Sequence, residues 1–182
     1  MKVHSSALLK ELSDYVNTHL AYANSLKSVS NDLLNAKQDL NAWSALECLE
    51  HLNLCLNFYI PEIKKRLASS QKVTSDFFKT NYLGNKFALS MLPKENMKKV
   101  KTFKKVNPIH SNLNKENTIG TFIHHQQHLL QLLELSQNEN LTKTKTATLL
   151  PFFKLQLGNT FRVIIYHNER HIIQAQKQID IH

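Results

Sequence analysis

Residues 44–68 read SALECLEHLNLCLNFYIPEIKKRLA, and the spacing of their apolar residues is the clearest indication of the fold. Small and apolar side chains recur every three or four positions, which is the period of an amphipathic helix. The pattern predicts a helix from about Ser44 to Leu67, capped by Asn41 or Ser44 and kinked at Pro61, which has no backbone N–H to donate. One arc of this helix is expected to face the core: Ser44, Cys48, His51, Leu52, Cys55 and Tyr59.

Three further stretches show the same period and predict helices from about His4 to Lys27, from Lys115 to Ser136 and from Gly158 to Gln178. Strand signals are nearly absent. Residues 70–112 show no sustained helical period and are expected to form a long connection between the second and third helices, which allows neighbouring helices to run parallel. Of the 182 residues, 42% are hydrophobic and only 3 are Gly. We therefore predict an all-α four-helix bundle that forms a single domain over residues 1–182.

The last predicted helix carries two histidines one turn apart, in YHNERHIIQAQKQI (residues 166–179). Because an α-helix places residues i and i+4 on one face, His167 and His171 can direct two imidazoles at one ion. Both lie at the edge of the buried face, and His51 on another helix can supply a third ligand. Three protein nitrogens with an open fourth position are typical of a catalytic metal site. The pattern thus favours a metal site formed by His51, His167 and His171.

The residues alone are equally consistent with histidines that bind no metal. The chain has 10 His, so some pairs at this spacing are expected by chance. One such pair, His124 and His128, shares its stripe with Gln127 and Gln131 and is expected to be solvated. A core-facing His51 needs partners for its ring nitrogens, and a hydrogen-bonded neighbour would serve as well as a metal.

Three segments of the chain resemble the DinB-like superfamily. They are ECLEHL around His51, YLGNKFALSMLPKENMKKVKTFKKVNP (residues 82–108) and HNERHIIQA in the last helix. The resemblance implies an up-down-down-up four-helix bundle that holds a divalent ion, nickel or zinc, through three histidines, at the positions occupied here by His51, His167 and His171. Some members transfer low-molecular-weight thiols such as bacillithiol or mycothiol. Dimers are frequent among them, so a homodimer is one expectation.

The expected function is that of a metal-dependent enzyme, either a hydrolase or a low-molecular-weight-thiol S-transferase that acts on a small molecule. The alternative is a non-catalytic helical bundle that binds a small molecule or a protein, since no general acid or base is evident beyond the three histidines. The catalytic residues are therefore unknown. Glu47, one turn before His51, is a candidate partner for that ring, and Asn168 and Gln174 are candidates to line the site.

The charge of the chain is strongly positive, with 23 Lys and Arg against 14 Asp and Glu and a formal net charge of +9. Much of the excess lies in Lys94–Lys105, where apolar residues recur every three positions: Met97, Val100, Phe103 and Val106. We interpret this segment as a solvated connection pinned by apolar side chains rather than as a phosphate-binding patch. Nucleic acid is accordingly disfavoured as a partner.

The N-terminal stretch carries polar and acidic residues throughout, so neither a secretory signal nor a membrane span is predicted there. A cytoplasmic location without a membrane partner is expected. Cys48 and Cys55 are seven positions apart in one helix, too far for a disulfide between them. Both are expected to be reduced, buried thiols, and an inert thiol is favoured for Cys48 over a metal-binding thiolate.

Overall fold

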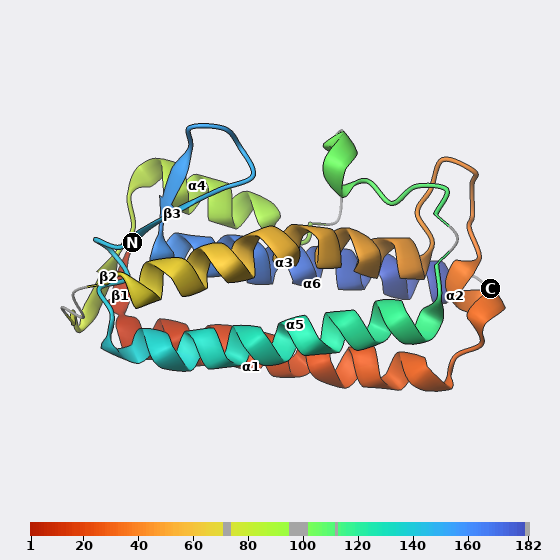
Figure 1. Cartoon of the computed structure of the whole chain (residues 1–182), viewed down its shortest axis with the longest axis horizontal. Helices are drawn as coiled ribbons and strands as arrows, with labels where there is room; N and C mark the ends of the chain where they lie inside the picture. The colour runs from red at the N-terminus through yellow and green to blue at the C-terminus, as the bar shows by residue number, and fades with distance from the viewer. Residues whose placement is uncertain (71–73, 95–101, 112, 181–182) are drawn as a thin grey trace.

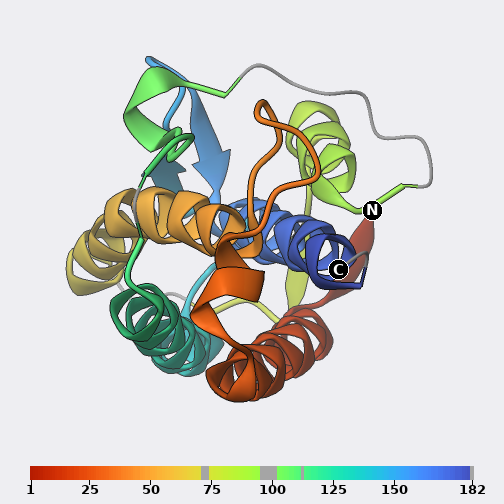
Figure 2. The same cartoon turned by 90° about the vertical axis from the view of Figure 1, so that its right-hand side faces the viewer.

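The structure, a computed structural model, describes residues 1–70, 74–94, 102–111 and 113–180. Four long helices form its body: α1 (Ser5–Ser25), α3 (Ala45–Ala68), α5 (Lys115–Leu135) and α6 (Leu157–Ile179). Helices α1 and α6 run in one direction, and α3 and α5 run in the opposite direction (Figure 1). Both α1 and α3 pack against α5 and α6, so the four helices surround one core (Figure 2).

The core consists of apolar side chains on the inward face of each long helix. They include Leu12, Val16, Leu49, Leu52, Leu56, Phe122, Leu129, Phe161 and Ile165. The all-α prediction is confirmed, and every residue of the arc predicted to face the core from α3 is buried. Among the described residues, no helix combines the length and the apolarity that crossing a bilayer would require.

A capping box fixes the start of α3. The Ser44 hydroxyl accepts a hydrogen bond from the Glu47 N–H at 3.2 Å, and the Glu47 carboxylate accepts one from the Ser44 N–H at 2.9 Å. Lys37 also contacts this carboxylate, at 2.7 Å. Ser44 rather than Asn41 is therefore the cap, and α3 continues from it through Pro61 to Ala68.

The connection between α3 and α5 contains helices that were not predicted, namely α4 (Tyr82–Met91) and the 3-10 helix η2 (Lys104–Val106). The Asn81 side chain caps α4 by accepting a hydrogen bond from the Gly84 N–H at 2.7 Å. Gly84 lets α4 approach α6 closely, because a Cβ there would lie 2.2 Å from Asn159 Nδ2. A helix this short shows too few turns for a clear period, and tertiary packing stabilises it.

The remaining described elements are short. Strand β1 (Lys2–His4) pairs antiparallel with β2 (Phe77–Lys79), and β3 (Lys145–Ala147) pairs antiparallel with β4 (Lys154–Gln156). Strands of three residues are too short to show an alternating pattern, which explains why the sequence analysis found almost no strand signal. Three short helices complete the connections: η1 (Leu26–Ser28), α2 (Asn31–Asn35) and η3 (Ser136–Asn138).

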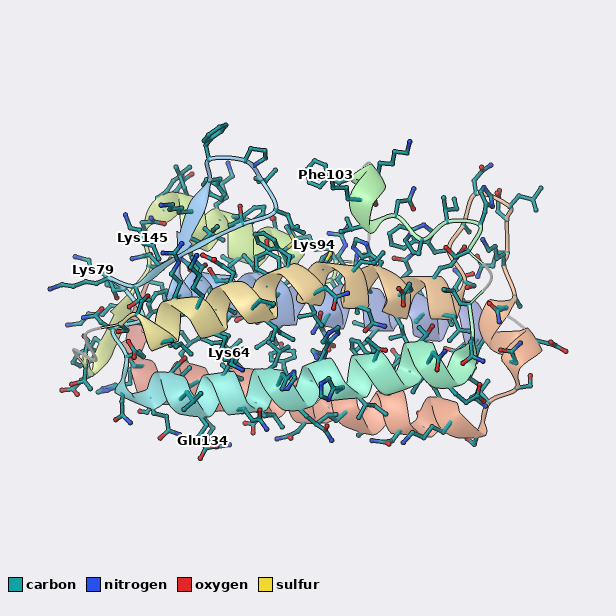
Figure 3. The ribbon with its side chains drawn as sticks, viewed as in Figure 1. Lys64, Lys79, Lys94, Phe103, Glu134 and Lys145 are labelled. Carbon is teal, nitrogen blue, oxygen red and sulfur yellow. The ribbon has the colours of Figure 1, made fainter. Side chains whose placement is uncertain are left out.

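The lysine-rich connection was predicted to be anchored by its apolar side chains. This is confirmed for Val106, which is buried, and wrong for Phe103, which is 54% exposed. Figure 3 shows Phe103 and Lys94 on the side of the bundle that also carries α4 and η2. Met97 and Val100, which were predicted to pin the same segment, lie outside the described residues.

Candidate metal centre

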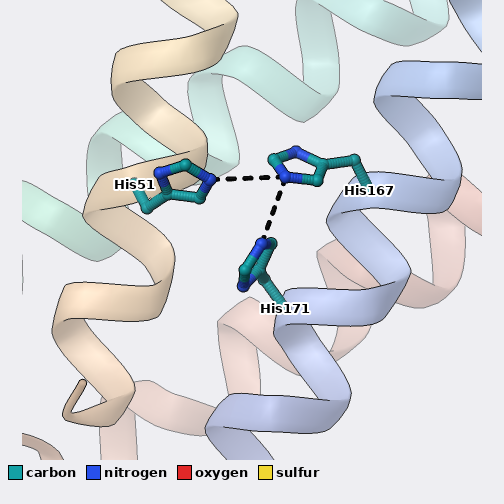
Figure 4. Close-up of side chains that lie close together, drawn as sticks. All are labelled: His51, His167 and His171. Atoms are coloured by element: carbon teal, nitrogen blue, oxygen red, sulfur yellow. Dashed lines mark hydrogen bonds between the residues drawn. The ribbon is translucent and has the colours of Figure 1, made fainter. Parts of the chain in front are cut away.

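The three predicted ligands meet between α3 and α6. His51 projects from α3, and His167 and His171 project from successive turns of α6 (Figure 4). The Nε2 atom of His167 lies 3.3 Å from that of His51 and 3.1 Å from that of His171. The ligand atoms of the three rings all lie within 4.8 Å of one another, which makes this cluster able to hold a metal ion.

The outer nitrogens of two rings are held by hydrogen bonds that determine their tautomers. His51 Nδ1 donates to the Val106 carbonyl oxygen at 2.6 Å, and His171 Nδ1 lies 3.0 Å from Gln174 Oε1. Since carbonyl oxygens only accept, each Nδ1 carries the proton and each Nε2 presents a free lone pair. Both lone pairs therefore point toward the centre of the cluster, as in a metal-binding histidine with an outer-shell acceptor.

One predicted contact of this site is wrong. Glu47 does not contact His51, because its carboxylate is engaged by the Ser44 N–H and by Lys37 at the start of α3. The hydrogen-bond acceptor of His51 is instead the backbone carbonyl of Val106, in η2. A backbone acceptor 55 positions away leaves no signal in the side-chain sequence, so sequence analysis could not have identified it. Gln174 does border the site, as predicted.

Burial and mutual proximity keep the three rings neutral. Burial lowers the pKa of His51 and outweighs the hydrogen bond to Val106, which acts in the opposite direction. The pKa of His167 lies well below its usual range because of burial, followed by the nearby His171, His51 and Arg170. Burial and His51 lower the pKa of His171 to about 3. At neutral pH all three rings are therefore in the form that binds metal.

Two of the three separations between the nitrogens fit a tetrahedral ion. With metal–nitrogen bonds of about 2.0–2.1 Å, two ligands of such an ion lie about 3.3–3.4 Å apart. The observed Nε2 separations of 3.3 and 3.1 Å are close to this value without any rearrangement of the helices. Three nitrogen donors suit zinc, nickel, copper and iron alike, and they leave a fourth position free for water or a ligand.

The site is bordered by Trp43 and Cys55. The indole ring of Trp43 packs 4.7 Å from the His51 ring and 5.6 Å from the His171 ring, and its Nε1 donates to Asn107 Oδ1 at 3.2 Å. The Cys55 sulfur lies 3.9 Å from His51 Nε2, and burial raises its pKa to about 12. Cys55 lies one helical turn after His51, so the sequence alone could have indicated that their side chains are close, although this contact was not predicted.

The other residues proposed near the site lie elsewhere. Asn168 points into the core, where its Nδ2 donates to Gln126 Oε1 at 3.3 Å. Cys48 is fully buried in the apolar core, and both cysteines are free thiols.

His124 is exposed and His128 half-buried on α5, and their ring centroids are 4.2 Å apart. This pair has the same spacing as His167 and His171, but no other described residue joins it in a metal-binding group.

His125, between these two, is a buried histidine that predicts a pH dependence of folding. Its Nδ1 donates to Asn53 Oδ1 at 3.3 Å, and burial, followed by His124 and His128, lowers its pKa to about 4. Between pH 4 and the unfolded value of about 6.5 the unfolded chain binds the extra proton, so stability falls as the pH falls. His125 alone should remove roughly 2–3 kcal/mol of unfolding free energy over this range.

The measurement is urea unfolding at pH 7 and pH 4.5 in the presence of EDTA. His125→Gln should flatten the pH dependence relative to the unchanged chain. The exposed neighbour provides the comparison: because His124 contributes less than burial to the lowered pKa of His125, His124→Gln should flatten the pH dependence much less than His125→Gln does. The same slope in the unchanged chain and in His125→Gln would refute the assignment.

Comparison with known proteins identifies one family. The sequence model of the DinB superfamily matches residues 16–175, a span that includes all three histidines of the cluster. No curated protein and no solved structure gives a significant match.

Proposed function

Because this chain belongs to the DinB superfamily, we propose that it is a zinc- or nickel-dependent enzyme that acts on a small molecule and transfers a low-molecular-weight thiol. His51, His167 and His171 would hold the ion. A divalent ion in this position lowers the pKa of a coordinated thiol or water and so supplies a nucleophile at neutral pH.

The observation that carries the proposal is the convergence of the three Nε2 atoms. Two of them present lone pairs to the third at 3.3 and 3.1 Å, and no proton arrangement of neutral rings satisfies both contacts, since His167 Nε2 has at most one proton to donate. An ion at the centre would satisfy all three lone pairs. The Val106 carbonyl and the Gln174 amide would then keep the His51 and His171 rings oriented toward it.

The surroundings favour thiol transfer over hydrolysis. None of the hydrogen bonds that the three histidines make to described residues involves a carboxylate, and Glu169, between His167 and His171, is bound to His19 at 2.9 Å. Hydrolysis is commonly assisted by a general base, whereas a thiol with a pKa near 8.5 is readily ionised beside a divalent ion. Trp43 would shield one side of the centre from water.

The test combines metal analysis with activity assays. Protein purified without an affinity tag is analysed by ICP-MS, reconstituted with zinc or nickel, and assayed for transfer of cysteine or another small thiol to an electrophile such as monochlorobimane. We expect one ion per chain and a rate that is lost with EDTA and restored by the metal. Hydrolysis of ester or amide substrates in place of thiol transfer would point to a hydrolase. Bound metal without either activity would favour a non-catalytic binding protein.

A further inference from the structure

We propose that Arg170 recognises a carboxylate of the small molecule that binds at the metal centre, so that the preferred thiols are anionic ones. This inference rests on the proposed metal site. Arg170 lies in α6 between the two histidines of that helix, three positions after His167 and directly before His171. Residues three positions apart are neighbours on a helix surface, so the guanidinium of Arg170 places a fixed positive charge beside His167.

The guanidinium of Arg170 is left with unused donors. It is half-buried, and its one hydrogen bond to a described residue is a long one, 3.4 Å from Nη1 to the Ser90 carbonyl oxygen in α4. The other two arginines of the chain make shorter contacts: Arg66 pairs with Glu62 at 2.8 Å, and Arg162 Nη1 donates to Asn85 and Asn159 at 3.0 and 3.1 Å. A guanidinium carries five N–H donors in a fork that matches a carboxylate. Arg170 thus has donors available for a ligand.

The charge balance of the site points to the same ligand. A histidine that binds metal through a nitrogen lone pair is a neutral ligand, so a divalent ion held by the three rings would keep its full charge, and Arg170 adds another positive charge. Within the described residues, no ion pair compensates Arg170, and the nearby Glu169 is bound to His19. Unbalanced positive charge at a partly buried site favours anionic ligands. A small molecule with both a thiolate and a carboxylate would neutralise most of it.

Arg170 also lies near the segments that border the histidines. Its contact with Ser90 places it beside the end of α4, while Trp43 and Val106 border the histidines from the segments before α3 and after α4. Figures 1 and 2 show α4 and η2 on the same side of the layer formed by α3 and α6. A ligand bound at the metal centre would therefore lie close to the indole of Trp43 and to the guanidinium of Arg170.

The experiment compares two thiols of equal size that differ in charge. Binding of 3-mercaptopropionate and of 3-mercaptopropionamide to the zinc-loaded protein is measured by titration calorimetry and by the fluorescence of Trp43, the single Trp of the chain. The carboxylate should bind about tenfold or more tightly than the amide, since hydrogen bonds to charged groups are the stronger ones. Arg170→Gln should reduce this preference to about twofold or less, and Arg170→Lys should retain part of it.

Arg66→Gln is the matched control, because it removes an arginine that pairs with Glu62 elsewhere on the protein, and it should keep the full preference. Zinc content is measured for each variant and is expected to stay at one ion per chain. An unchanged preference in Arg170→Gln with zinc bound, or no preference in the unchanged chain, would overturn the role of Arg170 and leave the metal site intact. Failure of the unchanged chain to bind zinc would instead overturn the proposed metal site, and the role of Arg170 with it.

Discussion

Replacing His167 with alanine should abolish stoichiometric zinc binding. Its Nε2 is the atom that both other rings approach, at 3.3 and 3.1 Å, so its loss removes the centre of the ligand set. Loss of an outer-shell partner alone typically costs 10–100-fold in metal affinity, and loss of a direct ligand should cost more than about 100-fold. Zinc content after dialysis against a weak chelator, measured by ICP-MS, should fall from about one ion per chain to background.

The same substitution should remove the stabilisation that zinc confers on the folded protein. Zinc at about 100 times its dissociation constant stabilises the folded state by about 2.7 kcal/mol, which corresponds to a melting-temperature rise of roughly 5–10 °C for a chain of this size. The unchanged chain should show this rise on zinc addition, and His167→Ala should not.

His128→Ala is the control, since it breaks a pair of identical spacing on α5 and should keep both the zinc and the rise in melting temperature. Equal zinc content in His167→Ala and in the unchanged chain would rule out the three-histidine site. Melting in EDTA shows whether His167→Ala folds, because the two metal-free proteins should melt within a few degrees of each other.

Gly158→Ala should strongly destabilise the protein. Gly158 lies in the first turn of α6, and a Cβ there would lie 2.7–2.9 Å from three carbons of the Phe78 ring. Phe78 is fully buried, so the ring cannot move aside without disturbing the core. Overpacking of this kind typically costs 1–3 kcal/mol, and we expect about 2–3 kcal/mol here, measured by urea unfolding.

Gly120→Ala makes the same chemical change and should raise the free energy of unfolding instead of lowering it. Gly120 lies inside α5, and a Cβ there would meet no atom within 4 Å. Alanine is the better helix former, so this variant should gain about 0.5–1 kcal/mol. Equal free energies of unfolding for Gly158→Ala and Gly120→Ala would contradict the close packing of α6 against Phe78.

Much of the candidate site could be predicted from the sequence because the relevant patterns are local. The helical period places His167 and His171 on one face of α6 and His51 on the core-facing arc of α3. The resemblance to the DinB-like superfamily pointed to the same three residues. Glu47 was assigned the wrong partner because helix spacing also allows contact with His51, and spacing alone does not reveal that the capping box uses its carboxylate.

The four long helices, their buried faces and the pairing of His167 with His171 can be predicted from the sequence, because each depends on residues within a few turns of one another. The contacts between distant segments depend on the tertiary structure. It places His51 against His167 across 116 positions, brings the Val106 carbonyl to His51 across 55, and packs α4 against α6 at Gly84. Such contacts arise only when the helices pack, since their free energy comes from burial and hydrogen bonds between segments that have no local preference for one another.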